Sequence, residues 1–189
     1  MNKKEIYSNL PKEDKKLIQM YFAAQQFKNA IEIDEIVTIP AKRIGLPENS
    51  ILEFKGVANI QCKGDKMVIK VFPFVVNKSF ACEIYLKLLL CINGEKIAKV
   101  HTLDSLFSKL DNSNQCKIID KIYGKHEEEQ RVEFRLNLGQ ASDAFEKWRY
   151  IYEHCDEKNM INHGFLNVFC DTLDKLCANS IKEKYNYDV

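Results

Sequence analysis

The sequence predicts one mainly helical domain, and three observations support this prediction. Its length of 189 residues suits a single domain. Only seven glycines and four prolines interrupt the chain, which leaves room for long helices. Apolar residues recur at intervals of three and four in several stretches, as on the buried face of an amphipathic helix. We therefore expect an all-α, up-and-down bundle of about five or six helices, mostly antiparallel to their neighbours.

An N-terminal helix is expected over roughly residues 12–32, following Pro11 and Asp14. Its apolar positions fall on one face: Leu17, Met20, Tyr21, Ala24, Phe27 and Ile31. Because one face is apolar and the other polar, this helix should pack against the bundle with the apolar side inward.

The pattern changes after this helix, because Pro40, Gly45 and Pro47 would break a continuing one. Two strand-like runs then flank the polar turn 63–66, which permits a small β-hairpin near residues 57–72. Residues 1–72 are thus predicted to comprise a helix and an irregular or hairpin segment.

The remaining helices are expected within residues 73–185, the main bundle. The stretch 73–92 is apolar on nearly every side and lies between Pro73 and Gly94, so it should form a central buried helix. Thr102 can cap a short helix that follows it. Later apolar stripes indicate further helices over residues 116–123, 138–154 and 165–181.

Charge and cysteine content argue against several classes of protein. The 28 basic and 27 acidic residues nearly cancel, so the chain lacks the basic excess of a general nucleic-acid-coating protein, although a local patch could bind RNA. The seven cysteines are odd in number and form no C-x-x-C pair, which favours a reducing, cytoplasmic location over a disulfide framework. The sequence shows no secretory signal and no membrane-length apolar run, so we expect no membrane association.

Common nucleotide-binding and hydrolase motifs are missing from the sequence. It contains no G-x-x-x-x-G-K-[ST], G-x-G-x-x-G or G-x-S-x-G pattern, so kinase, dehydrogenase and hydrolase functions have no positive support. His154, Cys155 and His163 fit no standard zinc spacing and offer no evident fourth ligand. We therefore expect neither a cofactor nor a metal.

Three segments occur in an order and spacing typical of one family. The first is A-C-E-I-Y-L-K-L-L-L at 81–90, followed by Asn93-Gly94. The second is H-T-L-D-S-L at 101–106. The third is F-E-K-W-R-Y-I-Y-E-H at 145–154, in which Arg149 and His154 form an R-x4-H pattern. Together these segments resemble the HEPN domain superfamily over roughly residues 73–185.

The resemblance implies a four-helix, up-and-down core that is often a homodimer. Many HEPN proteins are metal-independent endoribonucleases of toxin–antitoxin, abortive-infection and related defence systems. Others lack the catalytic pair and serve as binding or scaffold modules, sometimes beside nucleotidyltransferases. The partners implied for this chain are therefore a second copy, RNA, and a cognate antitoxin or nucleotidyltransferase.

Arg149 and His154 are the candidate catalytic residues. Histidine can transfer a proton near neutral pH, and a guanidinium can stabilise charge that develops on a phosphoryl group. Two observations favour a structural role instead: Tyr150 stands where the family often has a polar residue, and side chains five apart on a straight helix diverge by about 140°. In that structural role, Arg149 pairs with Glu153, and His154 is a residue at a helix end. The sequence leaves both roles open.

Glu83, Lys87 and Glu153 are candidates for supporting this site or a dimer interface. Glu83 and Lys87 are four apart in the order that favours an ion pair on one helix, which is also the simplest explanation of their spacing. His101 precedes a helix start, where a packing or hydrogen-bonding role is the more common one. The two hypotheses that remain are an RNA-cleaving enzyme and a catalytically silent HEPN module that binds RNA, a nucleotide or a protein.

Overall fold

The computed structural model describes most of the chain and shows a mainly helical bundle. The described residues are 3–30, 37–40, 51–54, 58–63, 66–69, 72–96, 99–125, 127–142, 144–145 and 161–189. The helices in this part are α1 (Lys3–Asn9), α2 (Lys12–Asn29), α3 (Phe72–Ile92), α4 (Leu103–Ser108), α5 (Asn112–Tyr123), α6 (Glu128–Ala141) and α8 (His163–Tyr185). The all-α prediction for the main fold is thus confirmed.

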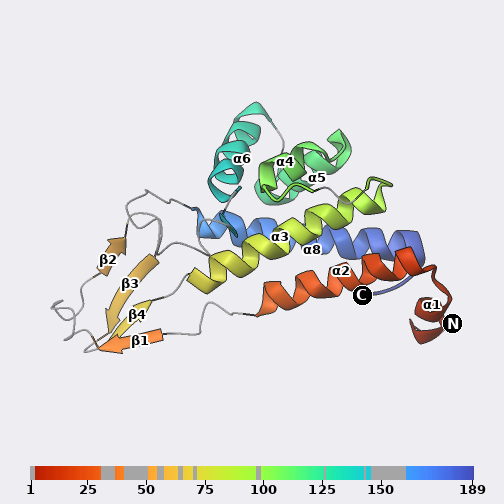
Figure 1. The fold of residues 1–189 in the computed structure, drawn as a ribbon. Coiled ribbons are helices and arrows are strands. Elements are labelled where there is room, and N and C mark those ends of the chain that lie inside the picture. Colours follow the sequence, from red (N-terminus) through yellow and green to blue (C-terminus); the bar gives the residue numbers. More distant parts are fainter. Residues whose placement is uncertain are drawn as a thin grey trace.

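Helix α3 forms the centre of the bundle. Its buried apolar residues face every direction around the helix axis, as a central helix requires: Phe74, Val75, Ala81, Cys82, Tyr85, Leu86, Leu88, Leu89 and Leu90. Helix α2 covers one side of α3 with buried Ile18, Tyr21 and Ala24, and α8 runs along another side (Figure 1). Helix α2, the predicted N-terminal helix, is therefore part of the same core as α3 and α8.

The direction of the long helices follows from contacts at their two ends. The Sγ of Cys177 lies 3.5 Å from the Tyr85 carbonyl oxygen, and Lys184 Nζ lies 2.9 Å from the Ile92 carbonyl oxygen. Later residues of α3 thus meet later residues of α8, so these two helices are parallel. This pair departs from a strictly up-and-down order, because α4, α5 and α6 intervene in the chain between α3 and α8.

Three cysteines are fully buried where α3 and α8 pack together. Cys82 belongs to α3, and Cys170 and Cys177 belong to α8. All three are free thiols. Burial raises the pKa of Cys82 and Cys177 well above the ordinary thiol value, which keeps both protonated. They act here as small apolar residues of the core.

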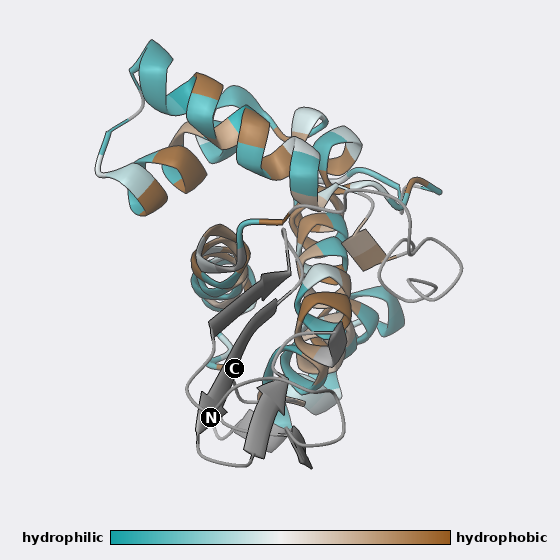
Figure 2. Cartoon of the chain, turned by 90° about the vertical axis from the view of Figure 1, so that its left-hand side faces the viewer, coloured by the Kyte–Doolittle hydropathy of each residue, from teal (hydrophilic) through white to brown (hydrophobic). Residues whose placement is uncertain are grey.

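Helices α4, α5 and α6 lie on the opposite side of α3 and α8 from α2 (Figure 1). Phe134 of α6 joins this group to the centre, because its ring centroid lies 4.7 Å from that of Phe107 in α4 and 5.7 Å from that of Phe169 in α8. Figure 2 looks along the molecule from the sheet end and shows brown and teal residues on the same helices. That mixture is typical of helices with one buried and one exposed face.

Two helix boundaries differ from those predicted. Helix α5 begins before residue 116, because the Asp111 side chain caps it by accepting a 2.9 Å hydrogen bond from the Asn114 backbone N–H. The predicted helix over 138–154 was wrong at its start, since Leu138 and Ala141 belong to α6. Helix α6 ends at Ala141, and the carbonyl of the next residue, Ser142, accepts the Leu103 N–H at 3.0 Å. Residues 146–160 lie outside the described residues.

A four-stranded antiparallel sheet lies between α2 and α3 in the chain and at one end of the bundle (Figure 1). Its strands are β1 (Val37–Pro40), β2 (Ile51–Phe54), β3 (Ala58–Lys63) and β4 (Lys66–Ile69), in the spatial order β1-β4-β3-β2. β3 and β4 pair from Ile60↔Ile69 to Lys63↔Lys66, so the predicted hairpin near 57–72 is confirmed. The two outer strands were not predicted, because each has only four residues, β1 ends in the breaker Pro40, and β2 follows the breaker Pro47.

Candidate functional site

Glu83 is a buried acidic side chain near the middle of α3. Only 3% of its surface is exposed. A carboxylate in such a place needs a compensating charge, and Lys87, one turn further along α3, lies 2.8 Å from its Oε1 with 12% of the lysine side chain exposed. The other oxygen, Oε2, is buried and has no hydrogen-bond partner in the described part of the chain. Among the described residues, nothing therefore uses the hydrogen-bonding capacity of this second oxygen.

His101 binds the same oxygen of Glu83 from a different segment. Its Nδ1 lies 2.9 Å from Glu83 Oε1, and 58% of its side chain is exposed. An ionised carboxylate only accepts hydrogen bonds, so Nδ1 carries a proton in this contact. The Nε2 end of the ring is then left as the nitrogen that can exchange a proton with solvent or a ligand. The arrangement is that of a histidine oriented by a buried acid.

The segment that carries His101 is fixed to the end of α6. Leu103 N–H donates to the Ser142 carbonyl at 3.0 Å, and Asp104 N–H donates to the Ser142 hydroxyl oxygen at 3.0 Å. The Ser142 hydroxyl in turn donates to the Asp104 carboxylate. This hydrogen bond lowers the pKa of Asp104, which therefore remains ionised. The start of α4 and the end of α6 are thus held together two residues from His101.

The chain passes from α6 toward residue 146 beside the same face of α3. The Phe145 ring stacks on Phe80 of α3, with centroids 4.6 Å apart and an interplanar angle of 20°. Phe80, Glu83 and Lys87 are spaced three and seven residues apart, so they share one face of α3. Residue 146 therefore follows directly from a contact on the α3 face that carries Glu83 and Lys87.

These observations bear on the predicted site residues to different degrees. Glu83 and Lys87 form the ion pair that their spacing predicted, and most of it is buried. The contact of Glu83 with His101 was not predicted, because eighteen residues separate the two and no local pattern links them. The candidate catalytic residues Arg149 and His154, and their neighbour Glu153, lie outside the described residues. Their predicted roles stay predictions.

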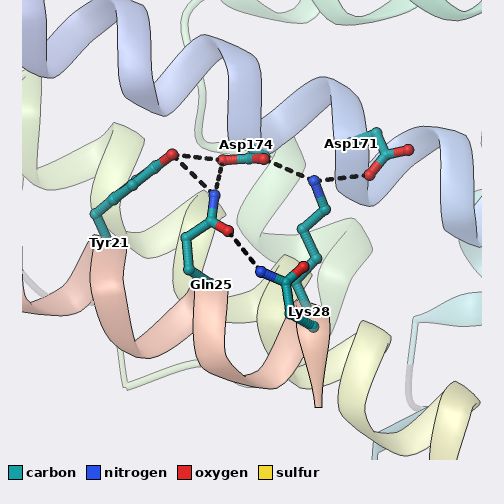
Figure 3. A network of polar contacts seen from close by, with 6 residues as sticks. Tyr21, Gln25, Lys28, Asp171 and Asp174 are labelled. Atoms are coloured by element: carbon teal, nitrogen blue, oxygen red, sulfur yellow. Dashed lines mark hydrogen bonds and ion pairs between the residues drawn. The ribbon is translucent and has the colours of Figure 1, made fainter. Parts of the chain in front are cut away.

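A second polar cluster joins α2 to α8 and has no counterpart in the sequence predictions (Figure 3). Asp174 of α8 accepts hydrogen bonds from three side chains of α2: Tyr21 Oη at 2.8 Å, Gln25 Nε2 at 2.5 Å and Lys28 Nζ at 2.6 Å. Lys28 also lies 2.8 Å from Asp171. Both oxygens of Asp174 are thereby engaged, so this cluster is satisfied within the protein.

The α2–α8 cluster changes the proton affinity of its members. Burial, followed by the hydrogen bond to Asp174, raises the pKa of Tyr21 to about 12. Burial alone would lower the pKa of Lys28, but its hydrogen bonds and ion pairs with Asp171 and Asp174 outweigh that effect and raise it. Both side chains therefore keep their protons throughout the physiological pH range, which suits a structural contact between helices.

The described residues contain no group of three or more histidine, cysteine, aspartate or glutamate side chains arranged to hold a metal ion. Among the same residues, no helix has both the length and the apolar character needed to cross a membrane. In the comparisons, no protein-family model matches this sequence, and no significant match was found among curated proteins or solved structures.

Proposed function

We propose that this protein is a metal-independent endoribonuclease of the HEPN type. Arg149 stabilises charge on the phosphoryl oxygens, and His154 acts as the general base that removes the ribose 2′-hydroxyl proton. The 2′-oxygen then attacks the adjacent phosphorus. This nucleophile is part of the substrate, so the reaction does not need a metal-bound water. The products are a 2′,3′-cyclic phosphate and a 5′-hydroxyl end.

The observation that carries the proposal is the charged cluster on α3 and the entry of the chain beside it. Phe145 stacks on Phe80, on the face of α3 that carries Glu83 and Lys87. Four residues span at most about 14 Å, so the Arg149 side chain is within range of this face. The same region of α3 holds a buried acid and its lysine partner, together with a half-exposed histidine, as polar groups that could support a catalytic pair.

A homodimer is part of the proposal, because the R-x4-H side chains diverge on a straight helix and two copies can bring them together. The biological setting we propose is a cytoplasmic toxin or phage-defence system with a cognate antitoxin or nucleotidyltransferase. The resemblance of residues 73–185 to HEPN proteins supports this setting, and the buried free thiols agree with a reducing compartment.

The test is RNA cleavage by the purified protein in excess EDTA. We expect wild-type protein to cut RNA, and Arg149→Ala and His154→Ala to lose at least about 100-fold in rate while remaining folded by circular dichroism. Arg135→Ala is the matched control for loss of a cation, since Arg135 is exposed on α6, and it should retain activity. Equal cleavage by all four proteins would show that the activity does not come from this site.

Mixing the two inactive variants tests the proposed dimer. If each site combines Arg149 of one copy with His154 of the other, a heterodimer of Arg149→Ala and His154→Ala holds one intact site. Random exchange of subunits should then restore about a quarter of wild-type activity. No recovery after verified exchange would place both residues of a site in the same copy.

The second candidate function is a catalytically silent HEPN module that binds RNA, a nucleotide or a protein. The observation that favours it is that one oxygen of Glu83 holds both Lys87 and His101, which is also a means of fastening α3 to the start of α4. In this case the wild-type protein binds its partner but leaves RNA intact.

A further inference from the structure

Lys78 is a buried cation of α3 that has no anionic partner among the described residues. Only 8% of its surface is exposed. Its Nζ lies 5.5 Å from the ring centroid of Phe74, one turn nearer the start of the helix, and no hydrogen bond or ion pair joins Lys78 to another described side chain. A ring attracts an ammonium group less strongly than a carboxylate does, and buried charges are normally paired. The charge of Lys78 is thus available to an anion from outside these residues.

The side of α3 that carries Lys78 faces the beginning of α8. Cys82, one turn later on the same side of α3, has its thiol hydrogen-bonded to the Cys170 thiol of α8. Because α3 and α8 are parallel, the turn of α8 that corresponds to Lys78 is the one before Cys170, around Leu166. Leu166 belongs to the first turn of α8, which begins at His163. Lys78 therefore lies at the level of the α8 N-terminus.

The starts of the two helices add positive charge at this end of the bundle. Both α3 and α8 begin at the end nearest the sheet (Figure 1). The N-terminus of a helix carries a partial positive charge and N–H groups without a partner in the helix. The Asn162 side chain accepts the Phe165 N–H at 3.0 Å, whereas the Gly164 N–H has no acceptor in the described part of the chain. Two helix dipoles and a lysine of the same sign thus lie close together.

The two helices provide no acidic side chain to balance this charge. Acidic residues are favoured in the first turn of a helix, yet neither α3 nor α8 has one there. The first acidic residue of α3 is Glu83, which binds Lys87 and His101. The first acidic residue of α8 is Asp171, which binds Lys28. Both carboxylates are therefore already engaged by other side chains.

We infer that Lys78 and the N-terminus of α8 form a binding site for a terminal phosphate group, as in inorganic phosphate or a nucleoside monophosphate. A helix N-terminus binds phosphate through its N–H groups and its dipole, and a lysine adds a point charge. Since so little of Lys78 is exposed, the site suits a compact terminal group better than a phosphate within a continuous RNA strand. The inference does not depend on the proposed ribonuclease function.

The Lys78 ammonium group can be reached from solvent. The polar atoms that are both fully buried and unpaired in the described part of the chain include the hydroxyl of its neighbour Ser79 but not Lys78 Nζ. Since Nζ has no hydrogen-bond partner there, it retains some exposed surface. A phosphate can therefore contact it without any change in the packing of α3 against α8.

Thermal unfolding at constant ionic strength, in chloride or in inorganic phosphate, tests the site. Phosphate at about ten times its Kd should raise the Tm of wild-type protein by about 3 °C. Lys78→Met keeps the length of the side chain but removes its charge, so it should show no rise. In chloride it should be at least as stable as wild type, because an uncompensated buried charge is gone. Lys175→Met is the matched control, since Lys175 is an exposed lysine of α8, and it should respond as wild type does.

A second pair of ligands separates a terminal phosphate from the RNA backbone. Titration calorimetry with adenosine 5′-monophosphate should give a Kd at least about tenfold weaker for Lys78→Met than for wild type. A 2′-O-methyl oligonucleotide with hydroxyl groups at both ends should bind the two proteins equally. If Lys78→Met weakens binding of the oligonucleotide instead, the site takes a phosphodiester and the inference of a terminal phosphate is wrong.

Three further results would overturn the inference. An equal rise in Tm for wild type and Lys78→Met would place phosphate binding elsewhere. No rise for wild type in about 50 mM phosphate, far above the affinity expected of a built site, would mean that no such site exists. A large loss of stability of Lys78→Met in chloride would mean that the lysine serves the fold through its contact with Phe74. If Lys78→Met does not fold, Lys78→Gln provides the same comparison, and Lys78→Arg, which keeps the charge, should retain the response to phosphate.

Discussion

Each of the two polar clusters described above is centred on a carboxylate with a lysine partner, but they differ in how many of the carboxylate oxygens accept hydrogen bonds. Asp174 in the α2–α8 cluster accepts hydrogen bonds from Tyr21, Gln25 and Lys28, through both of its oxygens. Glu83, Lys87 and His101, which precedes α4, form what we term the α3–α4 cluster. In it, Glu83 uses one oxygen for both Lys87 and His101 and leaves the other without a partner among the described residues. Fully satisfied buried networks rigidify a fold, whereas a buried polar atom without a partner calls for an explanation, of which a catalytic role is one.

Exposure separates the clusters in the same way. The Lys28 and Asp174 side chains are 15% and 14% exposed, so that cluster is closed to ligands at its centre. The α3–α4 cluster combines a buried acid with a histidine that is more than half exposed. We therefore expect the first cluster to govern stability and the second to govern activity, and the following predictions test that division.

The largest effect on stability is expected from Asp174→Ala. The variant removes the acceptor for three α2 side chains and leaves the Lys28 charge with Asp171 alone, which should lower the free energy of unfolding by about 3 kcal/mol. Urea denaturation followed by circular dichroism measures the change. Asp171→Ala is the matched control. It removes a 42% exposed partner of Lys28 only, so it should cost less than about 1 kcal/mol. Equal losses of stability in the two variants would contradict the claim that Asp174 contributes more than Asp171.

A smaller effect on stability is expected from Glu83→Gln. The substitution keeps the shape of the side chain but removes the charge that compensates the largely buried Lys87, at a cost of about 2 kcal/mol. His101→Ala should cost less than about 1 kcal/mol, because that side chain is mostly exposed. Thermal and urea unfolding of both variants provide the measurement. A loss in His101→Ala as large as that in Glu83→Gln would identify His101 as a structural tie between α3 and α4.

The smallest effect concerns alkaline pH. The folded protein raises the pKa of Tyr21 to about 12, so it holds this proton more tightly than the unfolded chain, in which a tyrosine titrates near pH 10. The resulting stability is fully present below about pH 10 and is lost as the pH rises toward about 12. Lys28 contributes with the same sign. Tyr21→Phe should therefore lose less stability than wild type between about pH 9.5 and 11.5.

Urea unfolding at a series of pH values tests this dependence. The two proteins should differ most at neutral pH and converge as Tyr21 ionises. Curves that stay parallel over the whole range would mean that the Tyr21 proton is not linked to folding.

The sequence was a good guide to the helices and a poor guide to the contacts between them. The apolar periodicity predicted α2, α3 and α8 because each buries a long stripe or is buried all round. The same periodicity wrongly assigned Leu138 and Ala141 to the segment that follows α6, because it does not reveal that α6 ends at Ala141, where the Ser142 carbonyl bonds to Leu103. Boundaries set by tertiary hydrogen bonds leave no local pattern.

The same distinction applies to the candidate site. Glu83 and Lys87 could be paired from sequence because four residues on a helix bring side chains together. The contact between Glu83 and His101 depends on how the chain returns after α3, which no spacing rule encodes. The contacts of Asp174 are even harder to predict from sequence, since Asp174 and its partners are separated by up to 153 residues.

Because three thiols are packed between α3 and α8, their rate of chemical labelling can report how often these helices separate. Cys82, Cys170 and Cys177 have no exposed surface, whereas Cys91 and Cys116 are partly exposed. An alkylating reagent should label the latter two first and the buried three only when α3 separates from α8. The slow labelling rate, read residue by residue by mass spectrometry, would report how often the centre of the bundle comes apart under native conditions.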